Sequence, residues 1–93
     1  MRPHTIRYNI GECPVCGQGE LAIAKEVLDG PSNDINYIIF CEECDAEWKS
    51  PHITDENRLP RQRKRGKIIN ATLDEIQGLH WEQHIISNAI DYE

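Results

Sequence analysis

Two short cysteine pairs constrain this chain more than any other feature. The only four cysteines of the 93-residue sequence are Cys13 and Cys16, then Cys41 and Cys44, with two residues inside each pair. A C-x-x-C turn lets two sulfurs converge on one ion, and two such turns complete the tetrahedral ligand set of Zn²⁺. In a reducing cytosol this spacing favours metal ligation over disulfides. The pattern therefore predicts one zinc site made by all four cysteines.

The size of the chain favours a structural role for that site. A domain this short buries only about 60 to 65% of the surface of its unfolded form, and apolar residues make up 39% of the sequence. A metal would supplement so thin a core. Four sulfurs leave no open position for water, so hydrolytic zinc chemistry is disfavoured. No catalytic motif stands out elsewhere, and we expect a protein that is not an enzyme.

Two other interpretations of the cysteines remain open. A rubredoxin-like iron site suits the first pair, but Asp45 rather than glycine follows the second pair. A redox dithiol needs a single exposed pair near a βαβ pattern, and this sequence has no such context. The spacing favours zinc over both.

Alternating hydrophobicity predicts strands on either side of the cysteines. Residues 6–10 alternate with the period of a half-buried strand, and they lead directly into the first pair. Residues 20–28 and 35–40 are also strand-like, and the segment between them, "DGPSND", is rich in turn residues. We expect a hairpin that begins just after the first pair and ends just before the second.

The sequences "CPVCG" and "CEEC", with Trp48 shortly after the second, resemble the zinc-ribbon superfamily. Those small domains hold one zinc between two cysteine knuckles on a three-stranded sheet. The resemblance covers about residues 10–50 and implies a fold far better than a function.

The rest of the chain divides into a charged loop and a helical region. Residues 51–67 contain two prolines and many charges without a lasting hydrophobic period, which predicts a loop. Thr72 and Glu75 have the spacing of a capping box, and a second helical period starts at Leu79. The apolar half of that second predicted helix consists of Trp81, Ile85, Ile86, Ala89, Ile90 and Tyr92.

These elements predict one compact α+β domain. Residues 1–50 form a zinc-ribbon β region, residues 51–67 a charged loop and residues 68–93 a C-terminal helical region. Both faces of the predicted hairpin are apolar, and leaving both in water would be costly. We therefore expect the C-terminal helix to pack on the small antiparallel sheet.

Charge is unevenly distributed along the chain. The formal net charge is −6, yet six of the ten basic residues lie within positions 58–67. The acidic residues around the second cysteine pair predict docking on a basic protein: Glu42, Glu43, Asp45 and Glu47, with Asp55 and Glu56, and further Glu12 and Glu20, as extensions. Candidate contacts to phosphates or to an acidic partner are Arg61, Arg63, Lys64 and Arg65. The simpler interpretation of that basic run is a solvated loop.

The combination of "CPVCGQGEL", "CEECDAEW" and "ATLDEIQGLHWEQHI" resembles small bacterial immunity proteins. Such proteins are coded beside polymorphic or contact-dependent growth inhibition toxins. The resemblance implies a protein that binds and occludes a cognate toxin domain, often a nuclease. Nucleases present cationic clefts for phosphates, so an acidic inhibitor would gain both steering and complementarity.

The alternative function is a nucleic-acid-binding or transcription-associated zinc-ribbon adaptor that uses the basic run. The net negative charge argues against it. The chain has no apolar run long enough to span a bilayer, and the start "MRPHTIRYNI" has no secretory apolar stretch. We therefore expect a cytoplasmic protein without membrane contacts.

Overall fold

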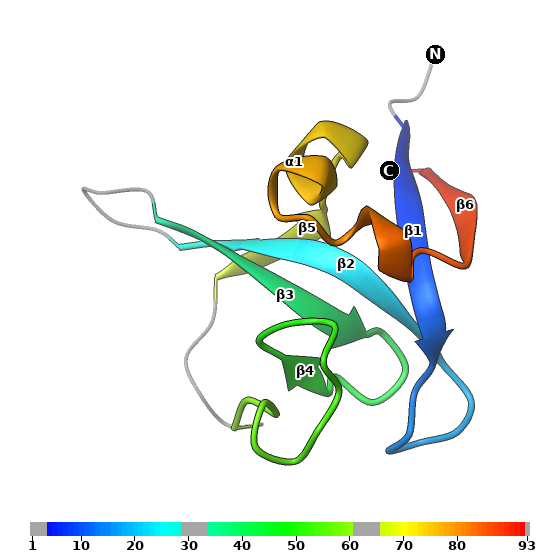
Figure 1. The fold of residues 1–93 in the computed structure, drawn as a ribbon. Helices are drawn as coiled ribbons and strands as arrows, with labels where there is room; N and C mark the ends of the chain where they lie inside the picture. The colour runs from blue at the N-terminus through cyan, green and yellow to red at the C-terminus, as the bar shows by residue number, and fades with distance from the viewer. Residues whose placement is uncertain (1–3, 29–33, 61–65, 93) are drawn as a thin grey trace.

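The computed structural model describes residues 4–28, 34–60 and 66–92. Its strands are β1 His4–Glu12, β2 Glu20–Val27, β3 Ile35–Cys41, β4 Glu47–Trp48, β5 Lys67–Asn70 and β6 Ser87–Tyr92. The helix α1 spans Leu73–Gly78, and the 3₁₀ turn η1 spans Glu82–His84. All six strands belong to one antiparallel sheet with the order β4-β3-β2-β1-β6, and β5 also pairs with β2 (Figure 1).

The hairpin predicted between the cysteine pairs is confirmed. β2 and β3 pair in register from Leu21 opposite Cys41 to Val27 opposite Ile35. The strand predicted at residues 6–10 is also confirmed, and it is longer than expected. These segments carry the β-branched and alternating residues that suit a pleated, half-buried surface.

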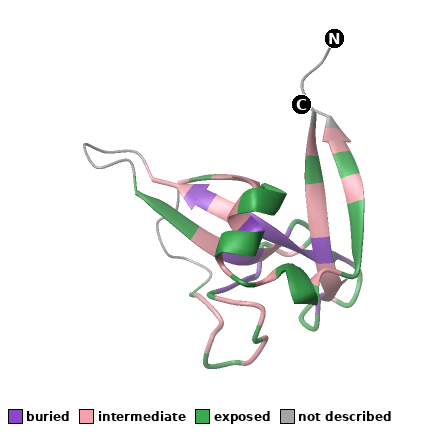
Figure 2. Ribbon diagram, turned by 45° about the horizontal axis from the view of Figure 1, so that its top comes forward, coloured by how far each residue is buried: buried purple, intermediate pink, exposed green. Residues whose placement is uncertain are grey.

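One face of the sheet forms the core. Alternation along the strands places Ile23, Ile39 and Trp48 on this face. The helix α1 adds Ile76, which is 0% exposed. Figure 2 shows that burial concentrates on the central strands, whereas the β1–β6 ribbon is mostly intermediate or exposed. The short α1 therefore covers the middle of the sheet rather than its β6 end.

The start of α1 is fixed by the capping box that the sequence predicts. Thr72 Oγ1 accepts a hydrogen bond from the Glu75 backbone N–H at 3.2 Å, and Glu75 Oε1 accepts one from the Thr72 N–H at 2.9 Å. The Glu75 carboxylate also binds Lys25 Nζ at 2.9 Å and accepts from Tyr37 Oη at 2.7 Å. One side chain therefore caps the helix and fastens it to neighbouring strands.

The prediction of a helix that starts at Leu79 and packs on the sheet is wrong. His80 has φ of +61°, a left-handed conformation that ends the helical path directly after α1. Residues 87–92 instead form β6, which pairs with β1 from Asn9 opposite Ser87 to His4 opposite Tyr92. The hydrogen bonds of that long ladder outweigh a local helical pattern, because helix propensity is only a weak preference.

Among the described residues, no helix has the length and apolar character needed to cross a bilayer.

The sheet also recruits the end of the predicted charged loop. Lys67 opens β5, which pairs with β2 from Val27 opposite Lys67 to Ala24 opposite Asn70. β1 pairs only with the first part of β2, up to Ala22, and the register shifts between Asn9 and Gly11. The same edge of β2 is therefore open to β5 from Ala24 onward. At Gly66, a Cβ atom would overlap the Val27 carbonyl oxygen, so this entry to β5 requires glycine.

Candidate metal centre and the surfaces around it

Two loops of matching geometry present the cysteines. In the first, the Gly17 N–H donates to the Cys13 carbonyl at 2.9 Å, and in the second the Asp45 N–H donates to the Cys41 carbonyl at 2.9 Å. Gly17 has φ of +67° and Asp45 has φ of +60°. Glycine adopts that conformation without strain, and aspartate is among the few other residues that visit it readily. Both knuckles therefore turn the same way and direct their sulfurs to a common point.

The four sulfurs form one cluster. The Sγ atoms of Cys13, Cys16, Cys41 and Cys44 all lie within 4.8 Å of one another. The Sγ atoms of Cys13 and Cys44 are 3.7 Å apart, as are those of Cys16 and Cys41. Zn–S bonds of about 2.3 Å in a tetrahedron place neighbouring sulfurs about 3.8 Å apart. The cluster therefore has the donor set and the spacing to hold one metal ion.

Burial differs between the two sulfurs of each knuckle. Cys13 is 1% exposed and Cys41 is 0% exposed, whereas Cys16 and Cys44 are half-buried. Burial raises the pKa of the Cys41 thiol to about 12 and also raises the pKa of Cys44. Backbone hydrogen bonds from Gln18 and Gly19 lower the pKa of Cys16 to about 7. A cation would offset the burial penalty, because it stabilises the thiolate forms.

The backbone of Gly19 packs against the sulfur cluster. The sequence did not single out this residue. Its carbonyl accepts from the Cys13 N–H at 2.8 Å. A Cβ atom at this position would lie 2.7 Å from Cys41 Sγ and 2.8 Å from Glu43 Cγ. The backbone must therefore pass directly against the sulfur cluster. The only sequence signal was a second glycine shortly after the first knuckle.

The cluster is continuous with the hydrophobic core. Cys13 and Cys41 belong to the same buried group as Leu21, Ala46 and Trp48. A metal here would join the end of β1 and the end of β3 to that core. Since the intervening hairpin spans residues 20–41, closing the site also fixes the hairpin's base.

Acidic side chains cluster near the start of β2, where the chain leaves the first cysteine knuckle. Glu20, Glu42 and Glu43 line one shallow pocket of about 140 Å³ together with Arg7 and Gln18. Glu12 is the cross-strand partner of Glu20. We call the four exposed carboxylates the acidic patch: Glu12, Glu20, Glu42 and Glu43. Arg7 is the nearby counter-charge, with Nη1 3.6 Å from Glu42 Oε2 and 3.1 Å from Asp91 Oδ1.

The other predicted contact residues are spread over different places. Asp45 is exposed in the second knuckle, but Glu47 is 2% exposed in β4 and cannot offer an open carboxylate. Asp55 and Glu56 are exposed in a separate turn, closed by the Arg58 N–H to the Asp55 carbonyl at 3.3 Å. The predicted basic contacts lie outside the described residues: Arg61, Arg63, Lys64 and Arg65.

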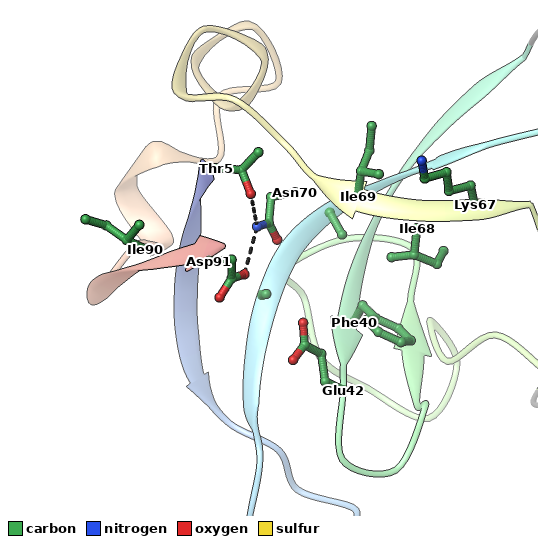
Figure 3. A pocket seen from close by; sticks show the side chains of 11 residues that line it. Thr5, Phe40, Glu42, Lys67, Ile68, Ile69, Asn70, Ile90 and Asp91 are labelled. Atoms are coloured by element: carbon green, nitrogen blue, oxygen red, sulfur yellow. Dashed lines mark hydrogen bonds between the residues drawn. The ribbon is translucent and has the colours of Figure 1, made fainter. Parts of the chain in front are cut away.

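A groove of about 800 Å³ lies on the face of the sheet opposite α1 (Figure 3). Phe40 and Ile68 supply apolar walls, and Glu42 lies at one end. Asn70 Nδ2 donates to Thr5 Oγ1 at 2.8 Å and to Asp91 Oδ2 at 2.9 Å, which ties β5 to the β1–β6 ribbon. The sequence analysis missed this groove, because neither β5 nor β6 was expected.

Comparison with known proteins gives one partial similarity. "Uncharacterized protein L48" of Acanthamoeba polyphaga mimivirus is 40% identical over 43 residues, which are 46% of this chain and 34% of that protein. The chain therefore spans about a third of the length of the curated relative it matches. No family model matches the chain. No solved structure matches it.

Proposed function

We propose that this protein binds another protein through the acidic patch, and that a structural Zn²⁺ held by the four cysteines fixes the shape of that surface. The observation that carries the proposal is the position of Glu20, Glu42 and Glu43 around one pocket. Glu42 and Glu43 are adjacent in sequence, and the β2–β3 register, which sets Leu21 opposite Cys41, places Glu20 beside them. A metal that closes the knuckles would fix the base of this hairpin and so hold the patch in one shape.

The chemistry of the patch favours a basic partner. Four thiolates around one divalent ion add two net negative charges close to the carboxylates, on a chain whose formal charge is already −6. Such a surface attracts cationic proteins and raises their association rate, and salt screens the attraction.

We propose that the partner is a cognate bacterial toxin domain, with a nuclease as the leading class, and that the protein acts as its immunity protein by occluding the basic active cleft. This proposal starts from the expectation set by the sequences of the cysteine knuckles and the terminal segment, which resemble small immunity proteins. A cationic phosphate-binding cleft is also the surface that an acidic patch complements best. The proposed role requires binding alone, in keeping with the expectation that the protein is not an enzyme.

The first experiment identifies the partner. The tagged protein is captured from its native host, with and without nuclease treatment, and bound proteins are identified by mass spectrometry. A basic protein that remains bound after nuclease treatment supports the proposal. Bound nucleic acid, or partners that disappear after nuclease treatment, would instead indicate the nucleic-acid adaptor.

The second experiment locates the contact. We expect the triple variant Glu20→Lys, Glu42→Lys and Glu43→Lys to slow association with that partner by about tenfold to a thousandfold at low salt, because steering changes sign. The matched control reverses the same number of charges at exposed sites outside the pocket: Asp34→Lys, Asp55→Lys and Glu56→Lys. Equal losses in the two triple variants would place the contact outside the acidic patch.

A further inference from the structure

The strand β6 forms one end of the sheet. It pairs with β1 on its inner side, and among the described residues no strand pairs with its outer side. Figure 1 shows β6 at the margin of the molecule with no ribbon beyond it. An unpaired edge presents a row of backbone N–H and C=O groups that another strand can bind.

This edge has few of the usual protections against strand addition, because its one charged side chain, Asp91, is paired with Arg7 of the neighbouring strand. Ser87–Tyr92 contains no lysine, arginine or proline. Its ladder with β1 is regular over all six pairs, without a bulge. The opposite end of the sheet is different, because β4 has only two residues and the Leu59 N–H caps the Glu47 carbonyl at 2.8 Å. Natural edge strands are normally short, bulged or rich in charge, whereas β6 is six residues long, regular and carries one paired charge.

Exposed isoleucines lie beside the open edge. Ile90 is 54% exposed and Ile6 is 41% exposed, and they are cross-strand partners on the same face. Both are large apolar side chains that would gain from burial.

We propose that β6 pairs antiparallel with β6 of a second copy of this chain, about a two-fold axis that passes through Ile90. An axis through a residue keeps equivalent faces of the two sheets on the same side, since side chains alternate along a strand. Ile90 then lies directly opposite the partner's Ile90. Across the joined sheets, Ile6, Ile90, the partner's Ile90 and the partner's Ile6 form one continuous apolar row.

Charges in this register are compatible with pairing. On the other face, Asp91 lies opposite the partner's Ala89, whose own β1 neighbour is the partner's Arg7. Arg7 of each chain already pairs with its own Asp91, with Nη1 3.1 Å from Oδ1, so two neutralised pairs would lie beside the small alanines and no like charges would lie directly opposite each other. An axis through Ala89 would instead place Ile90 opposite Asn88, which buries an amide against the isoleucine. The register through Ile90 is therefore the better match.

Sedimentation equilibrium of the wild-type protein, from low micromolar to millimolar concentration, tests the dimer. We expect the mass to rise from one chain to two. Ile90→Lys should weaken association by about tenfold or more, because two lysines would then face each other. Ile35→Lys is the matched control, since Ile35, in β3 at the far end of the hairpin, is 47% exposed against 54% for Ile90. A single-chain mass throughout, or equal weakening by both variants, would overturn the proposal.

Isotope-filtered NMR tests the register. In a mixture of labelled and unlabelled chains, we expect intermolecular contacts between the methyl groups of Ile90 and those of the partner's Ile90. Intermolecular contacts that involve Ile35 and omit Ile90 would overturn the β6 interface. Added salt should strengthen this dimer, because it screens two chains of charge −6. The same salt should weaken the proposed toxin complex, so the two associations can be tested separately.

Discussion

At the scale of single residues, the sulfur cluster depends on a glycine as well as on its cysteines. Gly19→Ala would place a Cβ atom 2.7 Å from Cys41 Sγ. We expect this change to reduce the free energy of unfolding of the metal-loaded protein by about 1–3 kcal/mol, the usual cost of overpacking. Chemical denaturation measures the effect, and a zinc competition titration should show weaker metal binding.

The matched control is Gly78→Ala, at the end of α1, where an added Cβ would meet nothing within 4 Å. Alanine is the better helix former, so this change should be neutral or slightly stabilising. If both alanine variants left metal affinity unchanged, the close approach of Gly19 to the sulfurs would have no bearing on the site.

Glu75 gives the fold a defined pH dependence. Burial opposes ionisation of Glu75, but hydrogen bonds from the Thr72 backbone, Lys25 and Tyr37 outweigh it and lower the pKa from 4.5 to about 2. The folded state therefore favours the ionised form. This contribution is fully present above pH 4.5 and is lost as the pH falls toward about 2. The same contact raises the pKa of Tyr37.

We expect Glu75→Gln to lower the free energy of unfolding by about 1–2 kcal/mol at neutral pH, since it removes the charged partner of Lys25. The difference in free energy of unfolding between wild type and variant should shrink as the pH falls from 4.5 toward about 2. Comparing the two proteins at each pH cancels acid effects that they share, including those at the cysteines. A difference that stays constant down to the lowest pH would contradict the assignment of the shift to Glu75.

At the scale of elements, α1 is too short to persist without its cap and its tertiary contacts. Thr72→Ala removes the hydroxyl that accepts from the Glu75 N–H. We expect a loss of about 1 kcal/mol in the free energy of unfolding. Thr72→Ser keeps the hydroxyl and serves as the control. Equal stability of the two variants in thermal denaturation would show that the cap contributes nothing.

The elements that the sequence predicted correctly are those specified by local signals. The strands beside the cysteine pairs show period-two alternation, and the capping box of Thr72 and Glu75 is a short-range motif. β6 is different, because the spacing of Ile85, Ala89 and Ile90 also fits a helix. Only pairing with β1, whose residues lie 78 to 88 positions earlier in sequence (from Asn9 with Ser87 to His4 with Tyr92), selects the strand. Such a distant choice has no local signature.

The same distinction applies to the candidate site. Convergence of the four sulfurs followed from ligand spacing within each knuckle. The arrangement of acidic side chains around the sulfurs could not be predicted in this way, because the exposure of each side chain depends on how the strands pair. Glu47 lies in a strand and is buried, whereas Glu20 comes from the other knuckle's side and joins Glu42 and Glu43.

At the scale of the whole molecule, the sheet joins the beginning, middle and end of the chain. β1 lies between β2 and the C-terminal β6, while the knuckles tie the ends of β1 and β3 together. A metal at the knuckles would thus support the acidic patch through the same strands that form the core. Folding and metal binding should then be coupled, as in other small metal-stapled domains.

The most direct test of the zinc assignment measures the metal content and the thermal stability of two purified proteins, the wild type and Cys44→Ser. We predict one zinc per wild-type chain, and loss of both zinc and the thermal unfolding transition in the variant. Chelation of the wild-type protein should have the same effect. A Cys44→Ser protein that kept its zinc and its thermal stability would contradict the assignment, as would a coloured wild-type protein that contained iron.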